Sequence, residues 1–313
     1  MNRSRFRPNI DFLLTQKCNY CNYACPCCTK IGKKNEDAKN NVVNAFLKLA
    51  KTLDENWQIT LLGGEPLMHP RFIEIIEKLR GLGLRVLIVT NFMAPIEEYK
   101  KIVDILGGHL TELTIEFHAD EVRDTHSFLE KIKELDNYKN ENTHLKVSSV
   151  LTEENAEQLK EIADGLNELG VTFQTEQLRV NNMLIDYSEE TIALFEEYRA
   201  IIPDNIDTYG SLCHSGNKFL VIDTDGIAYR CYCSRYVKGH IVGNILDRDF
   251  ELFEKGKACQ LKDCVCPKPI EYGMLDRSKN SNVKVVFQTL ANLISIPKMV
   301  VKNADISLKK YFT

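Results

Sequence analysis

The sequence lacks the features that mark a nucleic-acid-binding or a membrane-spanning chain. Its net charge at pH 7 is only −4, so no global field attracts a polyanion. Uninterrupted apolar runs are also missing, because the longest apolar region, residues 283–301, is broken by several polar residues and a proline. That region indicates an amphipathic helix ending near Pro297, too polar for a bilayer span. We predict no nucleic-acid partner and no transmembrane segment.

The sequence also lacks a recognisable export signal. The first residues, Asn2 to Arg5, lead straight into a short predicted strand. The chain nevertheless has eleven cysteines, and without export these favour metal ligation in a reducing compartment over disulfides. An apolar fraction of 44% and a charged fraction of 27% are typical of a globular protein. We therefore expect a cytoplasmic protein that binds metal.

Five of the eleven cysteines lie between Cys18 and Cys28, directly after an apolar stretch, residues 10–14, that predicts a strand. Within this loop only Cys21, Cys25 and Cys28 have the spacing C-x3-C-x2-C. Three thiolates can hold three irons of a [4Fe–4S] cube and leave the fourth iron open. An open position separates a catalytic metal site from a structural one. The alternative is a zinc knuckle, with Cys18-x2-Cys21 as one arm.

Strands and helices alternate along the first two thirds of the chain. Apolar periodicity and turn residues predict six strands, at residues 10–14, 57–62, 84–90, 110–118, 145–151 and 171–178. Helical patterns follow them at residues 42–53, 72–82, 96–106, 128–135, 153–169 and 188–202. This alternation predicts parallel βαβ units in a sheet that curls into part of a barrel, with its active site at the carboxyl ends of the strands. The cysteine loop follows the first strand and so belongs to that end.

The fourth predicted strand has two chemically different faces. Apolar side chains occupy every second position from Leu113 to Phe117, while Glu116 and His118 fall on the other face. Because helices cover the outer face of a barrel, the polar face points into the lumen. A lumen lined by Glu116 and His118 indicates a reaction chamber; the alternative is a hydrogen-bonded structural role for His118.

A second motif, Gly63-Gly64-Glu65-Pro66, follows the second predicted strand. The glycines allow the backbone to approach a ligand closely, and Glu65 offers a carboxylate to an ammonium group. Taken alone, two glycines before a proline that begins a helix predict only a turn.

The two motifs together, in this order on a βα scaffold and with Asn22 directly after the first ligand cysteine, resemble the radical S-adenosylmethionine (radical SAM) superfamily. The resemblance implies that the open iron chelates the amino and carboxylate groups of SAM and that residues 63–66 hold the amino group. It further implies reductive cleavage of SAM to methionine and a 5′-deoxyadenosyl radical, which abstracts hydrogen from a C–H bond. A flavodoxin- or ferredoxin-like electron donor is implied as a partner.

The same resemblance assigns further contacts with SAM. Thr90-Asn91 resembles the segment that meets the ribose or the carboxylate, and Ser148 resembles a residue that touches the ribose. Arg179 resembles a residue that pairs with the SAM carboxylate. The chain departs from the family pattern at Cys27, which stands where an aromatic residue is usual. Neither Cys27 nor the first cysteine of the loop has an assigned role.

The second half of the chain carries six more cysteines around a predicted hairpin. Two short apolar stretches joined at Asp225-Gly226 predict this hairpin, with Cys213 and Cys231 at its base. The arrangement resembles the SPASM/twitch extension of radical SAM enzymes, which implies an auxiliary [4Fe–4S] cluster in the one-cluster twitch form. The resemblance assigns as its ligands Cys213, Cys231, Cys264 and Cys266. Because the closing pair is C-x-C and not the usual C-x2-C, Cys259 is an alternative ligand, and a zinc ribbon is the alternative site.

We therefore predict an α/β fold with three parts. These are a partial (β/α)6 TIM-like barrel over residues 1–205, a small cysteine-rich twitch/SPASM-like extension over residues 206–270, and a C-terminal helix and tail over residues 271–313. The predicted activity is hydrogen abstraction in the maturation of a ribosomally made peptide, by epimerisation, crosslinking or oxidation. Two alternatives stay open: a dehydrogenase of a sugar or aminocyclitol alcohol that uses the auxiliary cluster as electron acceptor, and a non-catalytic iron–sulfur electron carrier. The motif at residues 63–66 speaks against the carrier, which needs no clamp for an amino group.

Cys233 is a candidate catalytic residue. On an extended segment its side chain shares a face with that of Cys231, which places a thiol beside the auxiliary cluster. Such a thiol can return a hydrogen atom to a substrate radical, as related peptide epimerases require. The alternative is that Cys233 is a buried small hydrophobe or a spare ligand.

Overall fold

The computed structural model describes residues 7–19, 36–119, 122, 124–177, 179–180, 183–184, 187–198, 206–232, 234, 241–260 and 263–264. These described residues fall into two compact units. The first combines Met1–Ala200 with His214–Lys257, and the second combines Ile201–Cys213 with Ala258–Thr313.

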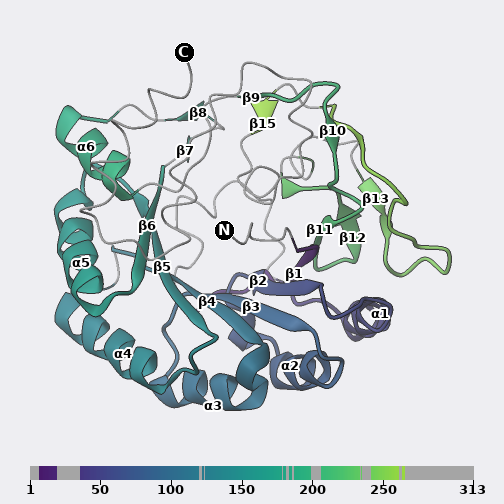
Figure 1. The fold of residues 1–313 in the computed structure, drawn as a ribbon, viewed down its shortest axis with the longest axis horizontal. Helices are drawn as coiled ribbons and strands as arrows, with labels where there is room; N and C mark the ends of the chain where they lie inside the picture. Colours follow the sequence, from purple (N-terminus) through teal and green to yellow (C-terminus); the bar gives the residue numbers. More distant parts are fainter. Residues whose placement is uncertain are drawn as a thin grey trace, which may run out of the picture. The chain divides into compact units, whose positions relative to one another are not determined.

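The first unit is an alternation of strands and helices (Figure 1). Its first six strands are β1 (Asn9–Thr15), β2 (Gln58–Gly63), β3 (Arg85–Thr90), β4 (Leu110–Glu116), β5 (His144–Leu151) and β6 (Thr172–Gln177). The helices are α1 (Asn40–Ala50), α2 (Phe72–Gly81), α3 (Ile96–Leu106), α4 (Thr125–Tyr138), α5 (Ala156–Leu169) and α6 (Glu189–Tyr198), with short 3₁₀ turns η1 (Pro66–Met68) and η2 (Gly107–His109). Neighbouring strands from β1 to β6 all pair in parallel. The predicted fold class, a partial TIM-like barrel of βα units, is confirmed.

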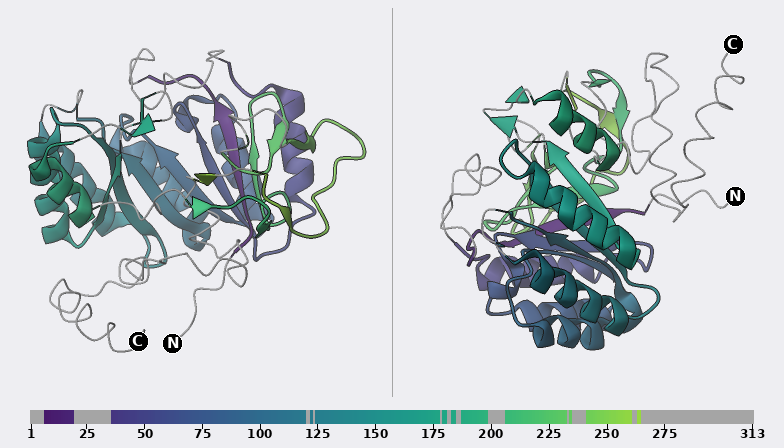
Figure 2. Two further views of the ribbon diagram at one scale, coloured as in Figure 1. Left: turned by 90° about the horizontal axis from the view of Figure 1, so that it is seen from above. Right: turned by 90° about the vertical axis from the view of Figure 1, so that its left-hand side faces the viewer.

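The helices cover one side of this sheet (Figure 2), and the sequence periodicity explains why. On α2 the buried side chains are Phe72, Ile75, Ile76 and Leu79, three to four residues apart along one stripe. On β1 every second residue faces these helices, and the ring of Phe12 stacks on that of Phe46 in α1 at 4.1 Å between centroids. The opposite face of these strands is mixed, with polar residues such as Asp11 and Thr60 beside apolar ones such as Leu13.

Three more strands extend the sheet beyond β1. They are β11 (Phe219–Ile222), β12 (Ile227–Tyr229) and β13 (Ile241–Asn244), and the full order is β13-β12-β11-β1-β2-β3-β4-β5-β6. The predicted hairpin is present, since β11 and β12 pair antiparallel around Gly226, whose φ of +83° suits glycine. The first strand of the hairpin, β11, pairs in parallel with β1, and residues 214–257 belong to the first unit. The apolar β11 covers what would otherwise be an open edge of β1.

The remaining described strands are short: β7 (Arg179–Val180), β8 (Met183–Leu184), β9 (Ile206–Asp207), β10 (Leu212–Cys213), β14 (Lys257–Ala258) and β15 (Asp263–Cys264). In the second unit, β15 pairs antiparallel with β9. Cys259 joins the same unit through its backbone, because its N–H donates to the carbonyl of Ser211 at 2.8 Å. Among the described residues, no helix is both long and apolar enough to cross a bilayer.

Candidate functional site

The glycine pair at the end of β2 lies directly against the end of β1. The N–H of Gly64 donates to the carbonyl of Thr15, and the N–H of Glu65 donates to that of Lys17, each at 2.7 Å. A Cβ atom on Gly63 would lie 2.2 Å from the Thr15 oxygen, and one on Gly64 would lie 2.0 Å from the Lys17 oxygen. No side chain fits at such distances. The sequence predicts that a ligand approaches these glycines, and the structure shows that the backbone leading into the cysteine loop also lies close to them.

Next to this contact, the side chain of Glu65 points into the protein interior. Glu65 is only 2% exposed, and it caps η1 by accepting the N–H of Leu67 at 3.1 Å. Its other described donors come from the end of β3: the Thr90 hydroxyl lies 3.0 Å from both carboxylate oxygens, and the N–H of Asn91 donates at 2.8 Å. One carboxylate therefore joins the ends of β2 and β3.

Burial dominates the electrostatics of this carboxylate. It raises the pKa of Glu65 to about 7, although the donors from Asn91, Leu67 and Thr90 favour the ionised form. The neighbouring Tyr99, whose hydroxyl lies 3.3 Å from that of Thr90, has its pKa raised by burial and by the charge of Glu65. An ionised carboxylate has about four acceptor positions, and three donors occupy it here. Among the described residues, no fourth donor takes the remaining position.

Asn91 connects this carboxylate to the start of the cysteine loop. Its side-chain N–H₂ donates to the side-chain oxygen of Asn19 at 2.8 Å and to the sulfur of Cys18 at 3.5 Å. Its side-chain oxygen accepts the N–H of Met93 at 3.0 Å. Cys18, which had no role in the sequence interpretation, is thus held by the segment that follows β3.

The two ends of the cysteine loop are joined at its base. The ammonium of Lys17 pairs with the carboxylate of Asp37 at 2.6 Å, and the Thr15 hydroxyl donates to the same carboxylate at 2.7 Å. Burial acts to raise the pKa of Asp37, but the hydrogen bonds from Lys17 and Thr15 outweigh it and lower the pKa. The sequence carries no signal for this pair, because Lys17 and Asp37 meet only through the β-bridge between Thr15 and Asp37.

The predicted chamber residue Glu116 on β4 lies beside Ser148 on β5, the residue that the resemblance assigns to the ribose of SAM. Glu116 and Ser148 are paired across the two strands, and the hydroxyl of Ser148 donates to the carboxylate of Glu116 at 2.7 Å. Phe117 faces the other way, with its ring 4.8 Å from that of Phe128 in α4, as the predicted alternation requires. His118 lies two residues after the end of β4 and is partly exposed.

Several predicted site residues lie outside the described residues: Cys21, Cys25, Cys28, Cys233 and Cys266. Cys27, which has no assigned role, lies outside them too. Only the backbone is described for Arg179 and Cys264. Cys213 and Cys231 are buried, and Cys259 is partly exposed, with its sulfur 3.3 Å from the hydroxyl of Thr208. Within the described part of the chain, no three His, Cys, Asp or Glu side chains gather closely enough to hold a metal ion.

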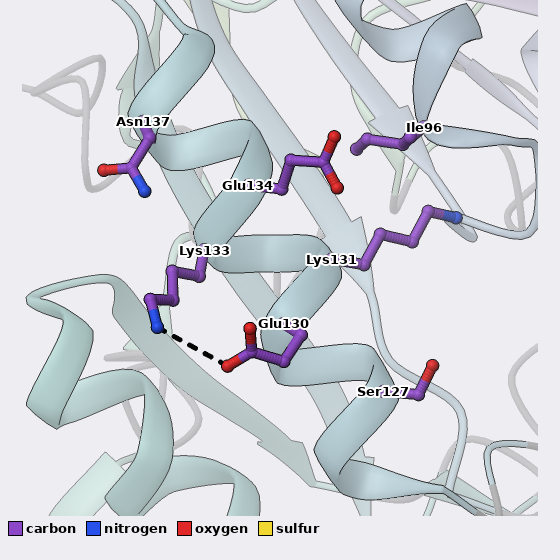
Figure 3. A pocket seen from close by; sticks show the side chains of 7 residues that line it. All are labelled: Ile96, Ser127, Glu130, Lys131, Lys133, Glu134 and Asn137. Carbon is purple, nitrogen blue, oxygen red and sulfur yellow. Dashed lines mark ion pairs between the residues drawn. The ribbon is translucent and has the colours of Figure 1, made fainter.

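A hollow of about 590 Å³ lies on the helical side of the first unit (Figure 3). It is lined by the start of α3 and by residues of α4, namely Ile96, Ser127, Glu130, Lys131, Lys133, Glu134 and Asn137. None of the site residues predicted from the sequence lines it.

The fold and the sequence motifs indicate a class, that of proteins with a radical SAM domain. The model of the radical SAM superfamily matches residues 15–166, the span that includes the cysteine loop and β2 to β5. This stretch, just under half of the chain, matches a radical SAM domain. Such a domain implies a [4Fe–4S] cluster and SAM. The residues fit both groups, because Glu65 retains an acceptor position for an ammonium group and the cysteine loop offers thiolates at the required spacing.

The individual proteins compared below share 25% or less sequence identity with this chain. The chain is 25% identical over 258 residues to the tungsten-containing aldehyde ferredoxin oxidoreductase cofactor-modifying protein of Pyrococcus furiosus, covering 71% of each chain. Its fold is similar to that of Streptococcus suis SuiB bound to the precursor peptide SuiA, with a TM-score of 0.55, 15% identity and 78% of this chain covered. It is also similar to anSMEcpe bound to AdoMet and the Cp18Cys peptide, with a TM-score of 0.51, 16% identity and coverage of 77% of this chain and 78% of that one. The match spans 63% of SuiB, less than two thirds of its length.

Proposed function

We propose that this radical SAM enzyme matures a ribosomally made peptide by acting on one of its C–H bonds, through epimerisation, crosslinking or oxidation. The observation that carries the proposal is the shared fold with two structures that hold peptides, SuiB with SuiA and anSMEcpe with Cp18Cys. When bound, the cluster and SAM supply a 5′-deoxyadenosyl radical, which is the hydrogen-abstracting species. The residues of the chain bind the cluster and SAM, orient the substrate and shield the radical from water.

In this proposal Cys21, Cys25 and Cys28 hold the cluster and leave one iron open for SAM. The open acceptor position of Glu65 takes the ammonium group of SAM, while its other bonds keep the carboxylate in place. SAM also meets the segment Gly63-Gly64-Glu65-Pro66 and the side chains of Thr90, Asn91, Ser148 and Arg179. A positive ligand group beside Glu65 offsets the burial that raises its pKa and so favours the ionised form.

The predicted chamber, on the face of the sheet opposite the helices, receives the substrate. Glu116 and His118 line it in the proposal, and the bond from Ser148 fixes the orientation of the Glu116 carboxylate. An auxiliary [4Fe–4S] cluster is held by Cys213, Cys231, Cys264 and Cys266, with Cys259 as the alternative ligand. Burial of Cys213 and Cys231 supports this assignment, since cluster ligands are commonly shielded from water.

The experiment is anaerobic reconstitution followed by a SAM cleavage assay. We expect about eight irons per chain, four for each cluster, a brown protein, and 5′-deoxyadenosine when reductant and SAM are added. Tightly bound zinc without visible absorbance would exclude both clusters. A fully loaded protein that releases no nucleoside would favour the electron carrier. About four irons with nucleoside formation would remove the auxiliary cluster alone.

A second candidate, oxidation of a sugar or aminocyclitol alcohol, is favoured by the spacing from Cys213 to Cys231 in the sequence. It resembles that of aminocyclitol dehydrogenases. Incubation with candidate peptides and with aminocyclitols separates the two, because only the true substrate raises the yield of nucleoside above the uncoupled level.

A further inference from the structure

Lys131 of α4 reaches from the helical side of the sheet to the loop that follows β3. Its ammonium donates to the carbonyl of Phe92 at 2.7 Å and to that of Ala94 at 2.6 Å. It also lies over two aromatic rings, 4.2 Å from the centroid of Phe92 and 5.2 Å from that of Tyr99. In Figure 3 Lys131 extends from one side of α4, whereas Lys133 lies on the other side and pairs with Glu130.

The loop that Lys131 contacts has a strained backbone. Phe92 has a φ of +60°, the only positive φ at a non-glycine residue among those described. A bulky residue seldom adopts this conformation, and it persists only where its surroundings hold it. The Phe92 ring is buried, 4.5 Å from the ring of Tyr99 and 6.1 Å from that of Phe128. The two carbonyls held by Lys131 belong to this turn, so the ammonium stabilises the strained conformation directly.

The same loop carries the residues that build the candidate site. The N–H of Phe92 donates to the hydroxyl of Thr90 at 3.2 Å, and Thr90 donates in turn to Glu65. Asn91 donates its N–H to Glu65 and its side chain to Cys18. A change of the backbone at Phe92 therefore moves the donors of Glu65 and the support of the cysteine loop together.

We propose that Lys131 is a positioning residue for SAM binding: its ammonium fixes the strained turn at Phe92 and so places Thr90 and Asn91 against Glu65. This inference rests on the proposed function, since it assumes that SAM binds beside Glu65. Packing of α4 does not need Lys131, because the buried side chains of that helix are Phe128, Ile132 and Leu135. A merely structural role would leave SAM affinity unchanged once the protein is folded.

The test compares Lys131→Met, which keeps the apolar stem and removes the donors, with Lys133→Met on the same helix. Hydrogen–deuterium exchange of the peptide covering residues 90–95 is followed in protein without clusters. We expect exchange at least about tenfold faster in Lys131→Met, because two charge-assisted hydrogen bonds are lost. After reconstitution, SAM affinity is measured from the change that SAM causes in the electron paramagnetic resonance spectrum of the reduced cluster. We expect about tenfold weaker binding in Lys131→Met at unchanged iron content, and no change in Lys133→Met.

The outcomes are distinct. Equal behaviour of the two variants in both measurements overturns the inference, and so does a loosened loop with unchanged SAM affinity. Wild-type protein that takes up iron but shows no response to SAM contradicts the proposed function, while the exchange data still report on the loop. Should Lys131→Met fail to fold, Lys131→Gln, which retains one donating group, is expected to give intermediate exchange and intermediate affinity. Wild-type values in that variant overturn the inference.

Discussion

The backbone N–H of Asn91 donates to the side chain of Glu65 at 2.8 Å, across 26 residues of sequence. This bond joins the loop after β3 to the motif after β2, and Asn91 extends the connection to Cys18. The carboxylate of Glu65 therefore has two roles. It must hold two strand ends together inside the protein, and in the proposed function it must also meet the ammonium of SAM.

The first prediction concerns stability and pH. The pKa of Glu65 is raised from 4.5 to about 7 in the folded protein, so between these values the folded state binds more protons than the unfolded state. The free energy of unfolding contributed by Glu65 is then fully present below pH 4.5, falls as pH rises, and is lost above about pH 7. Relative to Glu65→Gln, the wild type should lose on the order of 3 kcal/mol across this window.

Urea unfolding of cluster-free protein at pH 5, 6, 7 and 8 measures this difference. Glu74→Gln is the control, because the hydrogen bond from Arg71 lowers the pKa of Glu74 and gives the opposite, small trend. A constant difference between wild type and Glu65→Gln over the whole range would show that Glu65 titrates normally in the folded state.

The second prediction concerns SAM affinity. Glu65→Gln keeps the shape of the side chain but removes the charge that the ammonium meets. We expect SAM binding to weaken by about 1.5–3 kcal/mol, the value of a charge-assisted hydrogen bond. Equilibrium binding to reconstituted protein checks this, again with Glu74→Gln as control. Unchanged affinity in a folded Glu65→Gln protein would leave Glu65 with the structural role alone.

The third prediction separates the cysteines of the first loop. Ala at Cys21, Cys25 or Cys28 should abolish SAM cleavage, because a cube that loses one of three ligands cannot present one defined open iron. Ala at Cys18 or Cys27 should retain much of the activity. Iron content and 5′-deoxyadenosine yield are measured for all five variants. If Cys18 proves as essential as Cys25, the assigned ligand register is wrong.

The fourth prediction tests the contact between β1 and β2. Gly64→Ala places a Cβ atom 2.0 Å from the backbone oxygen of Lys17, a partner that cannot move without breaking the strand end. We expect a loss of stability of at least about 1–3 kcal/mol, as for overpacking in a core. Gly81→Ala is the control, since no atom lies within 4 Å of the added group and alanine favours the helix. Similar unfolding midpoints for the two variants would contradict the contact.

The sequence predicts the parts of this protein that depend on local periodicity. The alternation of apolar faces identifies β1 to β6 and their helices, and the lumen face of Glu116 follows from the same rule. Pairing partners are not encoded locally, so the position of β11 beside β1 could not be foreseen from its apolar run. The Lys17–Asp37 pair and the reach of Lys131 to Phe92 depend on tertiary contacts between distant segments. The glycine motif stands out in the sequence, but its closest backbone partner, the segment after β1, does not.

The last prediction concerns Cys233, which lies outside the described residues, two positions after the buried Cys231. An epimerase must return a hydrogen atom to the substrate radical, and a thiol beside the reacting carbon can donate it. A dehydrogenase needs the opposite outcome, in which the auxiliary cluster accepts the electron of the radical and no hydrogen returns.

Turnover of the substrate in D₂O distinguishes these fates, because a thiol exchanges its hydrogen with solvent. Donation by Cys233 predicts a product that carries one deuterium at the reacting carbon, and Cys233→Ala should lose that label while still forming 5′-deoxyadenosine. Cys27→Ala, which changes a cysteine of the other loop, should keep it. Mass spectrometry of the product gives the result. A product two mass units lighter than the substrate, formed equally well by Cys233→Ala, would exclude the donor role and favour alcohol oxidation, because hydrogen is then removed and never returned.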